Sequence, residues 1–399
     1  MDGTFSVTDN VGDRGVDTLS NVEIVRFDDG DVELLNNTFF TEGDDVVNGT
    51  EGDDIFDALG GDDTVNGLGG NDQISGGNGS DVLSGNAGDD TLNGDSGNDE
   101  LFGGEGDDIL NGGSGNDTLD GGNSVLGNTL NGGLGNDILI YSQSSIPTGI
   151  VDFIDGGAGS HDQLNITHVT GNFVVNLELG TLIAEMGELA ATLSNIEDVF
   201  IVFGNSDVYG DDNDNEISGG IAGGDNTFFA YGGNDILQGS SGNDELHGGE
   251  GVDEISGGRD SDQLFGDGGD DFLEGGEDSD TLTGGEGDDS IYGHYNIADD
   301  DGAVDYATYS GTQASYTVSD NMDGTYTVKD NVGTDGTDIL HNIEFLIFSD
   351  VTIDIETAAT GSGSIDGTPG NDNLMGTNDD DVINGLAGND ILNGLAGDD

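Results

Sequence analysis

The chain has 399 residues, with 84 acidic and only 4 basic side chains, so its formal net charge is −80. This charge excludes nucleic acids and anionic membrane surfaces as direct partners, because their phosphate groups would repel it. The sequence has no cysteine and no long apolar run, which excludes disulfides, thiolate metal sites and a membrane-spanning helix. The first residues also lack the basic and apolar regions of a signal peptide.

Residues 1–40 are predicted to be the C-terminal part of a β module. Residues 1–27 align without a gap with residues 322–348, and both copies begin Met-Asp-Gly-Thr and continue with Asn-Val-Gly. Because the same segment recurs 321 residues later, we expect the chain to be an excerpt of a longer tandem array. It would open inside one large module and end inside the next.

Residues 41–165 repeat a unit of nine residues, which is plain in residues 112–120 and reads Gly-Gly-x-Gly-x-Asp-x-apolar-x. Glycine precedes each aspartate by two positions, and an apolar residue follows it by two. Such order is not a product of acidic composition, so it weighs against a disordered acidic chain. The aspartates of this block are Asp45, Asp54, Asp63, Asp72, Asp81, Asp90, Asp99, Asp108, Asp117 and Asp137.

Each unit is long enough for a very short strand and a tight turn, since glycine adopts positive φ without strain. Two units make one coil, and coils stack at the spacing of a β-sheet, about 4.8 Å. The sequence therefore predicts an all-β fold, with parallel β-roll (β-solenoid) blocks of nonapeptide repeats joined by small antiparallel β segments. One edge of the first roll would carry Asp45, Asp63, Asp81, Asp99 and Asp117, and the other Asp54, Asp72, Asp90 and Asp108.

The rest of the chain alternates between such blocks and less regular segments. Residues 166–203 are predicted to be a β linker, residues 204–293 a second roll, and residues 294–360 a β linker module that repeats residues 1–40. Within that module, Asp323-Gly324 predicts a hairpin turn. Residues 361–399 would be a truncated third roll. The aspartates of these two rolls are Asp235, Asp244, Asp253, Asp262, Asp271, Asp280 and Asp289, then Asp372, Asp381 and Asp390.

A roll of this sequence needs a stabiliser other than its core. One buried aliphatic side chain per unit cannot offset the entropy of ordering nine residues together with the repulsion between stacked carboxylates. A bound cation would supply the difference. Carboxylate and carbonyl oxygens are hard ligands that favour Ca²⁺, whereas Mg²⁺ demands a small octahedral shell and keeps its waters. We therefore expect multiple calcium ions.

The repeated unit resembles the RTX (repeats-in-toxin, hemolysin-type calcium-binding) family, and the resemblance covers well over half of the chain. It implies a parallel β-roll that holds Ca²⁺ between successive loops on each edge. It also implies a bacterial protein secreted to the extracellular space, through a type I secretion system. Carried over residue by residue, the ligands would be the twenty aspartates named above, together with loop carbonyls.

Several positions depart from the pattern. Asn128, Asn215 and Asn226 stand where aspartate is expected, so we expect weak or absent ions there. An extra loop residue makes a site at Asp162 doubtful. Aspartate replaces the glycine two before the ligand at three positions, where it tolerates the left-handed conformation, so those turns should survive. They are Asp260, Asp278 and Asp379.

We find no catalytic constellation and predict that the chain is not an enzyme. It has no His-Glu-x-x-His, no Gly-x-Ser-x-Gly and no phosphate-binding loop, and its five histidines are expected in turns or on the surface. The leading hypothesis is a calcium-dependent structural or adhesin-type module, whose cell-surface or host-surface ligand the sequence does not identify. Two alternatives remain open. One is the secretion tail of an RTX protease, lipase or epimerase, and the other is a disordered acidic cation buffer.

Overall fold

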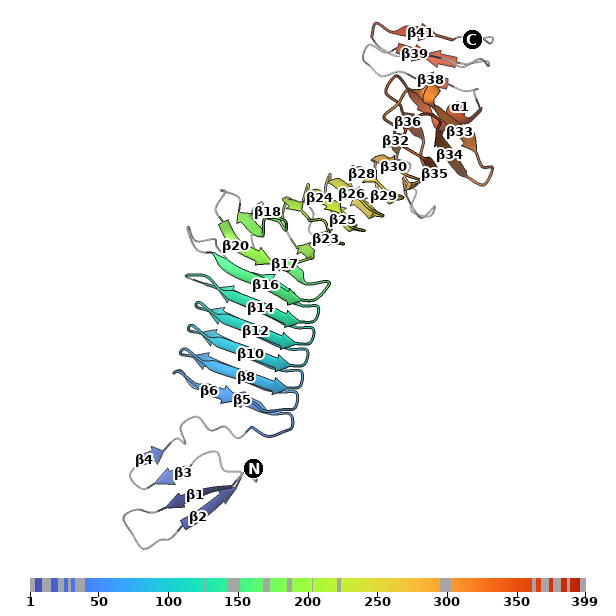
Figure 1. Ribbon diagram of the computed structural model, residues 1–399. Helices are drawn as coiled ribbons and strands as arrows, with labels where there is room; N and C mark the ends of the chain where they lie inside the picture. The colour runs from blue at the N-terminus through green and yellow to red at the C-terminus, as the bar shows by residue number, and fades with distance from the viewer. Residues whose placement is uncertain are drawn as a thin grey trace. The chain divides into compact units, whose positions relative to one another are not determined.

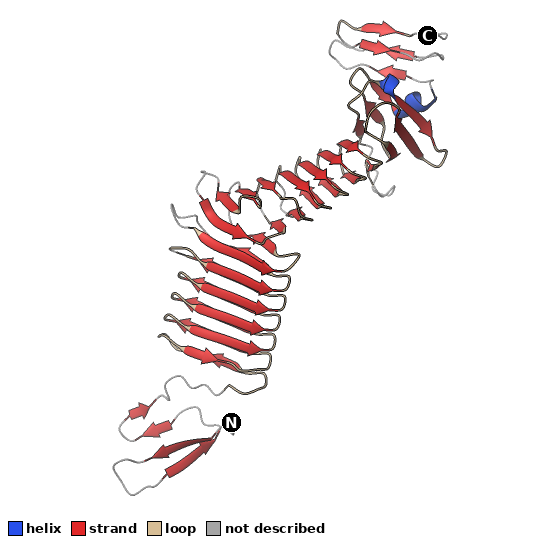
Figure 2. Cartoon of the chain, viewed as in Figure 1, coloured by secondary structure: helices blue, strands red, loops and turns tan. Residues whose placement is uncertain are grey.

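The computed structural model divides into two compact units, formed by Met1–Leu164 with Ala191–Ile196 and by Asn165–Ala190 with Glu197–Asp399 (Figure 1). Strands make up most of both units, and the single α-helix among the described residues is α1 (Ile355–Thr360) (Figure 2). The structure describes residues 4–8, 16–20, 25–27, 30–32, 40–124, 126–142, 151–167, 173–184, 189–202, 204–220, 224–294, 303–360, 364–366, 373–375, 382–385 and 388–394.

The first unit contains a roll of two parallel sheets, whose strands alternate along the chain. One sheet has β5 (Val46–Asn48), β7 (Thr64–Gly69), β9 (Val82–Ala87), β11 (Glu100–Glu105), β13 (Thr118–Asn123) and β15 (Ile138–Tyr141). The other has β6 (Ile55–Asp57), β8 (Gln73–Asn78), β10 (Thr91–Ser96), β12 (Ile109–Ser114), β14 (Thr129–Leu134) and β16 (Asp152–Ala158), with β20 (Leu189–Ser194) beside β16.

The register of these strands follows the sequence period. Leu92 of β10 pairs with Leu110 of β12, and both side chains are fully buried in the core. Two turn positions of the regular units adopt positive φ and are most often glycine, as Gly113 (114°) and Gly115 (130°) are. A side chain there would be strained, which explains why the unit repeats glycine at these positions. Asp260 and Asp278 keep this conformation at φ 70° and 73°, so the expectation for those two turns is confirmed. Asp379 lies outside the described residues.

The second unit contains another two-sheet parallel roll. One sheet includes β22 (Ser206–Tyr209), β24 (Thr227–Gly232), β26 (Glu245–Glu250), β28 (Gln263–Gly268), β30 (Thr281–Glu286) and β32 (Tyr306–Thr308). The other includes β21 (Asp198–Ile201), β23 (Glu216–Gly219), β25 (Ile236–Ser241), β27 (Glu254–Arg259), β29 (Phe272–Gly276) and β31 (Ser290–Tyr292).

The segments predicted to be linkers contain antiparallel pairs, as expected. In residues 166–203, β18 (Phe173–Asn176) pairs antiparallel with β19 (Thr181–Ala184) and also parallel with β22. This part of the chain therefore joins the sheet of the second roll. The strand β17 (Gln163–Ile166) lies just before it. The six predicted domain boundaries remain a prediction.

Residues 303–360 form a small β module that continues the second roll. β33 (Tyr316–Asp320), β34 (Thr325–Asp330) and β35 (Thr337–His341) are antiparallel, and β35 pairs parallel with β31. The predicted hairpin is confirmed. A short 3₁₀ turn η1 (Gln313–Ser315) precedes it, and β36 (Phe345–Ile347) and β37 (Thr352–Asp354) complete the module. Its core contains the aromatic cluster Tyr309, Tyr316 and Phe348.

The internal sequence repeat is also a structural repeat. In residues 1–40 the strands are β1 (Thr4–Thr8), β2 (Val16–Ser20), β3 (Val25–Phe27) and β4 (Gly30–Val32). Thr4 pairs with Ser20, as Thr325 pairs with His341 at the aligned positions. The same holds further along, because Val25 pairs with Val32 and Leu346 with Ile353.

The third block keeps the same parallel register. β38 (Ser364–Asp366) pairs with β40 (Val382–Asn384), and β39 (Asn373–Met375) pairs with β41 (Ile391–Asn393). The predicted fold class, parallel β-roll blocks joined by antiparallel β segments, is thus confirmed. Across the described part of the chain, no helix is long and apolar enough to cross a membrane.

Candidate metal site

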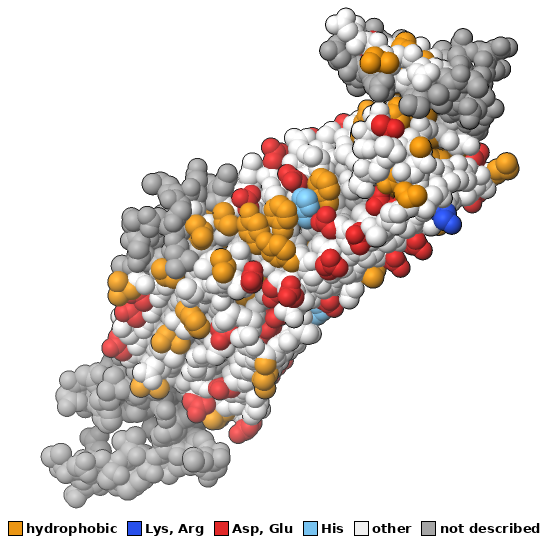
Figure 3. Space-filling model, turned by 45° about the horizontal axis from the view of Figure 1, so that its top comes forward, with side chains coloured by type: hydrophobic (Ala, Val, Ile, Leu, Met, Phe, Trp, Pro, Cys, Tyr) orange, Lys and Arg blue, Asp and Glu red, His pale blue; other side chains and the backbone are white. Residues whose placement is uncertain are grey.

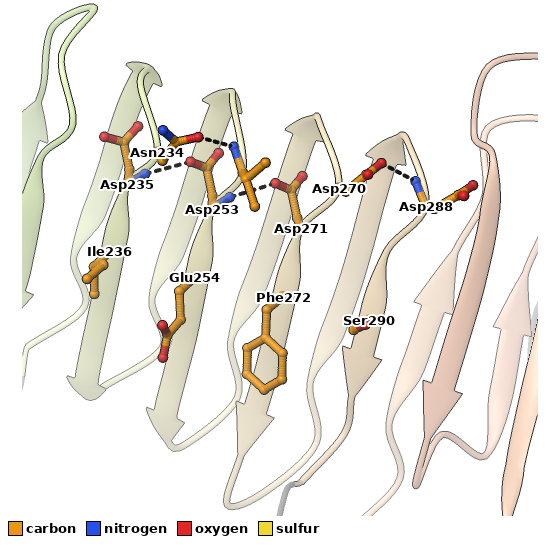
Figure 4. Close-up of a pocket in the computed structure, with 11 residues that line it drawn as sticks. Asn234, Asp235, Ile236, Asp253, Glu254, Asp270, Asp271, Phe272, Asp288 and Ser290 are labelled. Carbon is orange, nitrogen blue, oxygen red and sulfur yellow. Dashed lines mark hydrogen bonds between the residues drawn. The ribbon is translucent and has the colours of Figure 1, made fainter.

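The repeated aspartates form a hydrogen-bonded ladder along each edge of a roll. From Asp63 onward, Oδ1 of each aspartate in the regular turns accepts a hydrogen bond of 2.7–2.9 Å from the backbone N–H of the equivalent residue one turn earlier, as Asp253 does from Asp235 (Figure 4). The donor and the acceptor are 18 residues apart in the regular turns. Each aspartate therefore ties its own turn to the preceding one, and the predicted edges are correct.

In fourteen of these ladder aspartates the second carboxylate oxygen has no partner. The side chains are at most 3% exposed, yet Oδ2 makes no hydrogen bond. A buried carboxylate oxygen without a partner is costly, so the arrangement calls for a positive charge. This holds for Asp63, Asp72, Asp81, Asp90, Asp99, Asp108, Asp117, Asp137, Asp235, Asp244, Asp253, Asp262, Asp271 and Asp289.

In most turns a glycine five residues earlier leaves room beside the orphaned oxygen, whereas Ala58 and Ala230 take this position before Asp63 and Asp235. A Cβ built on Gly112 would lie 2.4 Å from Oδ2 of Asp117 and 2.5 Å from the carbonyl oxygen of Gly132. The same holds at Gly266, with Asp271 Oδ2 and the carbonyl oxygen of Gly284 both at 2.4 Å. The space beside Oδ2 in these turns is thus bordered by a carboxylate and a backbone carbonyl, the hard oxygen ligands that suit Ca²⁺.

The electrostatics of the ladder also favour a cation. Burial, followed by the neighbouring carboxylates, raises the pKa of Asp262 and of Asp271 to about 8, against the lowering effect of the backbone N–H. Burial likewise raises the pKa of Asp99 and of Asp108 to about 7. At neutral pH Asp262 and Asp271 therefore hold a proton, and Asp99 and Asp108 hold one about half of the time, unless another positive charge replaces it. The residues present therefore fit a metal ion of the calcium type.

Each turn contributes a single ladder carboxylate to each edge of the roll, and not a cluster of carboxylates. Among the described residues, no group of three or more histidine, aspartate or glutamate side chains could hold a metal ion by itself. Further ligands would have to come from loop carbonyls. On the edge drawn in Figure 4, Asp235, Asp253 and Asp271 line a hollow of about 450 Å³ together with Asp270 and Asp288.

At two of the asparagine positions the side-chain amide occupies the place of the orphaned oxygen. Nδ2 of Asn226 donates to the carbonyl oxygen of Gly224 at 3.0 Å, and Nδ2 of Asn128 to that of Gly122 at 3.4 Å. Asn215 donates to the carbonyl oxygen of Glu197 at 2.9 Å. The amide thus satisfies a loop carbonyl without an ion, which supports the expectation of weak or absent ions in these turns.

The first turns and the last block differ from the regular ladder. Oδ2 of Asp45 and of Asp54 accepts a hydrogen bond of 2.6 Å from the backbone N–H of Thr41 and Thr50, four residues earlier. Asp390 is half-buried next to β41. Asp372 and Asp381 lie outside the described residues.

Four aspartates that we did not predict continue the ladder into the less regular segments. Asp162, whose site looked doubtful from its lengthened loop, accepts the N–H of Asp137 at 2.8 Å, so it does take a ladder position. Asp338 accepts the N–H of Asp289 at 3.1 Å, across 49 residues of sequence. The other two are Asp152, which accepts from Asn128, and Asp305, which accepts from Asp280.

A second ladder also escaped the sequence analysis. The residue before each ladder aspartate is often Asp, Asn or Ser, and its side chain accepts the N–H of the equivalent residue one turn later. Oδ1 of Asp89 accepts from Asp107 at 3.0 Å, and Oδ1 of Asp270 from Asp288 at 2.9 Å. This outer ladder runs in the opposite direction to the inner one, so each loop is tied to both neighbours.

One of the described histidines, His294, lies 3.9 Å from Oδ2 of the ladder residue Asp305. His161 is exposed, whereas His247, His294 and His341 are half-buried, and His168 lies outside the described residues. His247 lies 3.3 Å from both Glu245 and Asp267.

Comparison with protein families finds the RTX calcium-binding nonapeptide repeat, in overlapping matches that together cover more than half of the chain. Comparison with curated proteins finds no match. The matches span residues 41–74, 66–101, 75–110, 93–124, 127–142, 209–246, 222–255, 229–264, 265–294 and 366–399, which include all the aspartates predicted as ligands from the sequence. The chain therefore belongs to the RTX calcium-binding nonapeptide repeat family.

Proposed function

We propose that the ladder aspartates bind Ca²⁺ between successive turns of each roll. The observation that carries this proposal is the row of buried Oδ2 atoms that lack a partner. Most of them face a space kept open by a glycine, and in several turns a backbone carbonyl also borders that space. The regular ladder of both rolls would hold most of the ions, and the turns with Asn128, Asn215 and Asn226 would hold few or none.

Calcium binding would serve the folding of the chain. Without a cation, the rolls would bury a row of carboxylates in a protein of net charge −80. Where binding requires the folded site, the binding free energy is folding free energy. We expect midpoints near 10⁻⁴–10⁻³ M, the range of extracellular calcium modules. The chain would then stay unfolded in a cell of low calcium and fold after secretion, for which a type I system is the route that fits this family.

The proposed role is structural rather than catalytic. The module of residues 322–348 repeats the sequence and the strand register of residues 1–27, and both described rolls are built from the same unit. A chain of recurring rolls and modules suits an extended adhesin-type protein, in which each roll spaces or supports its neighbours.

Far-UV circular dichroism of the full chain in EGTA and in millimolar Ca²⁺ tests the proposal. We expect an unfolded spectrum in EGTA and a β spectrum with Ca²⁺, with Mg²⁺ at the same concentration as the control that should not fold the chain. Identical spectra in EGTA and Ca²⁺ would contradict calcium-dependent folding. Calorimetric titration then counts the ions, and nanomolar affinity for most of them would contradict the extracellular role.

A further inference from the structure

One face of the second roll carries a column of stacked rings. Tyr209, Phe229, His247 and Phe265 occupy the same position in successive strands β22, β24, β26 and β28. Their ring centroids are 5.4, 4.5 and 4.3 Å apart, and neighbouring rings are within 15° of parallel. Because the rings cover one another's faces, the column presents mainly ring edges to solvent. Hydrophobic side chains gather beside a histidine and carboxylates on the face shown in Figure 3.

A slot opens beside this column. Two residues further along each strand, Tyr231, Gly249 and Asp267 are paired in register in β24, β26 and β28. Gly249 has no side chain, so no side chain stands between Tyr231 and Asp267, whose strands are two strand spacings apart, roughly 9.6 Å. Phe229 and His247 form one side, and the hollow measures about 340 Å³. That width admits one planar group between the phenol ring and the carboxylate.

The other side of the slot is acidic. Glu250 and Glu286 line it, both are exposed, and no basic side chain of the described residues forms an ion pair with either. Together with Asp267, whose Oδ2 also lies 3.3 Å from Nδ1 of His247, three carboxylates and one tyrosine line the slot. A cation with a flat face matches that combination, because it gains both ion pairing and a cation–π contact. The guanidinium of arginine has this shape, whereas the ammonium of lysine does not.

The tyrosine that forms the aromatic wall is held in an unfavourable conformation. Tyr231 has φ 77° and is 45% exposed, at a position where most turns of the rolls have Gly, Asn or Asp. Leu59 and Leu68 share this conformation in the first roll. A bulky residue at positive φ costs free energy, and Tyr231 gains little from burial in return. A binding role for the ring accounts for its presence.

We propose that this slot binds an arginine side chain presented by a cationic segment of a partner protein. The guanidinium stacks on Tyr231 and pairs with Asp267 and Glu250, and the calcium ladder of the same roll holds the walls in place. The proposal does not depend on which oxygen atoms ligate calcium, only on a folded second roll.

The test uses the calcium-loaded full chain and the peptide acetyl-Gly-Gly-Arg-Gly-Gly-amide, with saturation-transfer NMR to detect binding. The counterpart with citrulline keeps the planar shape without the charge, the lysine counterpart keeps the charge without the planar shape, and methyl glucoside probes a sugar site. We expect the arginine peptide to bind, the lysine peptide to bind more weakly, and citrulline and methyl glucoside not to bind. Equal binding of the arginine and citrulline peptides, or displacement of the arginine peptide by methyl glucoside, would overturn the proposal.

Variants separate the slot from the general attraction of an acidic protein for cations. Asp267→Asn should lower the affinity for the arginine peptide about three- to tenfold, the range of a single partly exposed ion pair. Tyr231→Ala should weaken it about two- to fivefold, and Tyr231→Phe should retain binding. Asp95→Asn is the matched control, because Asp95 occupies the same repeat position at φ 71° in the first roll. If Asp267→Asn and Asp95→Asn lowered the affinity for the arginine peptide equally, with β structure unchanged in both, the attraction would be non-specific and the proposal would be wrong.

Discussion

The backbone N–H of Asp63 donates a 2.8 Å hydrogen bond to Oδ1 of Asp81, one turn further along the first roll. The same carboxylate keeps its other oxygen buried and unpartnered. One side chain therefore does two things: Oδ1 joins two turns, and Oδ2 is left for a cation. These two roles can be separated by mutation.

Replacing Asp81 by alanine removes both roles, whereas Asp81→Asn removes only the charge. We expect Asp81→Ala to leave the N–H of Asp63 unsatisfied, at a cost of about 1–3 kcal/mol, and to raise the Ca²⁺ midpoint of the first roll. Asp81→Asn should lose about one bound ion but fold at a lower cost, since an amide can serve at this position as Asn128 does. The measurement is calcium titration by circular dichroism and calorimetry. Indistinguishable variants would mean that the inter-turn hydrogen bond contributes nothing.

The converse change should create a site. Nδ2 of Asn215 donates to the carbonyl oxygen of Glu197, and Asn215→Asp replaces that donor by an oxygen. We expect the variant to bind about one more calcium ion and to be less stable without calcium. Asn234→Asp adds the same charge in the outer ladder, where Oδ1 of Asn234 already accepts the N–H of Val252 at 3.0 Å. Calorimetric stoichiometry should rise for Asn215→Asp alone, and a rise in both would indicate that any added charge recruits calcium.

The period of the sequence predicted the inner ladder well, for a physical reason. Strands in a roll pair in the register set by the repeat length, so side chains two units apart must stack on one edge. The aspartate at that position does not vary within the regular turns, as Asp63 and Asp81 illustrate. The nine-residue period was enough to predict the fold class, the edge of the roll on which each aspartate lies, and the role of the glycines in the turns.

The parts that could not be predicted depend on contacts across irregular loops. Asp338 lies 49 residues beyond Asp289, so no fixed period points to it, although Gly336 and Leu340 keep the local pattern around it. The outer ladder was missed because its position accepts Asp, Asn or Ser, and only the backbone N–H one turn later reveals the common role. Residue identity carries less information there than hydrogen-bonding capacity.

The space beside Oδ2 of Asp117 should tolerate no side chain at Gly112, although Ala58 and Ala230 take the equivalent position before Asp63 and Asp235. A Cβ on Gly112 would lie 2.4 Å from Oδ2 of Asp117, and backbone and carboxylate would both have to shift. We expect Gly112→Ala to raise the Ca²⁺ midpoint and to destabilise the roll by about 1–3 kcal/mol. Ser114→Ala, two residues away, gives up one 3.3 Å hydrogen bond to the carbonyl oxygen of Asp95 and should change the midpoint little. Chemical denaturation at fixed calcium compares the two variants, and equal effects would mean that the glycine cradle is not needed.

Acid should partly replace calcium. Burial raises the folded-state pKa of Asp262 and Asp271 to about 8, above the value of 3.8 for an exposed aspartate. A group whose pKa is raised on folding stabilises the folded state at low pH, and this contribution is lost as the pH rises through the folded pKa. The calcium-free chain should therefore gain β structure as the pH falls from 8 to about 5. With calcium present the sign reverses, because protons compete with the ion, and the Ca²⁺ midpoint should rise on acidification. A calcium-free spectrum that does not change over this range would contradict the raised pKa values.

Asp338 should link the β module to the second roll. Its Oδ1 accepts the N–H of Asp289, and β35, which carries it, pairs with β31 of the roll. Asp338→Ala leaves that N–H without a partner inside the structure, so we expect a loss of about 1–3 kcal/mol concentrated where roll and module meet. Hydrogen exchange resolves this, because the amides of β31 and β35 should exchange faster while those of β9 and β11 in the first roll stay protected.

The matched control for this variant breaks a hydrogen bond inside the module instead. Oδ1 of Asp350 accepts the N–H of Gln313 at 2.9 Å, and Asp350 is exposed and outside the ladder. Asp350→Ala removes the same charge, and we expect faster exchange near Gln313 but unchanged protection in β31. If Asp338→Ala and Asp350→Ala exposed the same amides, the module would respond as one body to any lost contact. The stabilising ladder would then end at Asp289, and the hydrogen bond to Asp338 would not link the module to the roll.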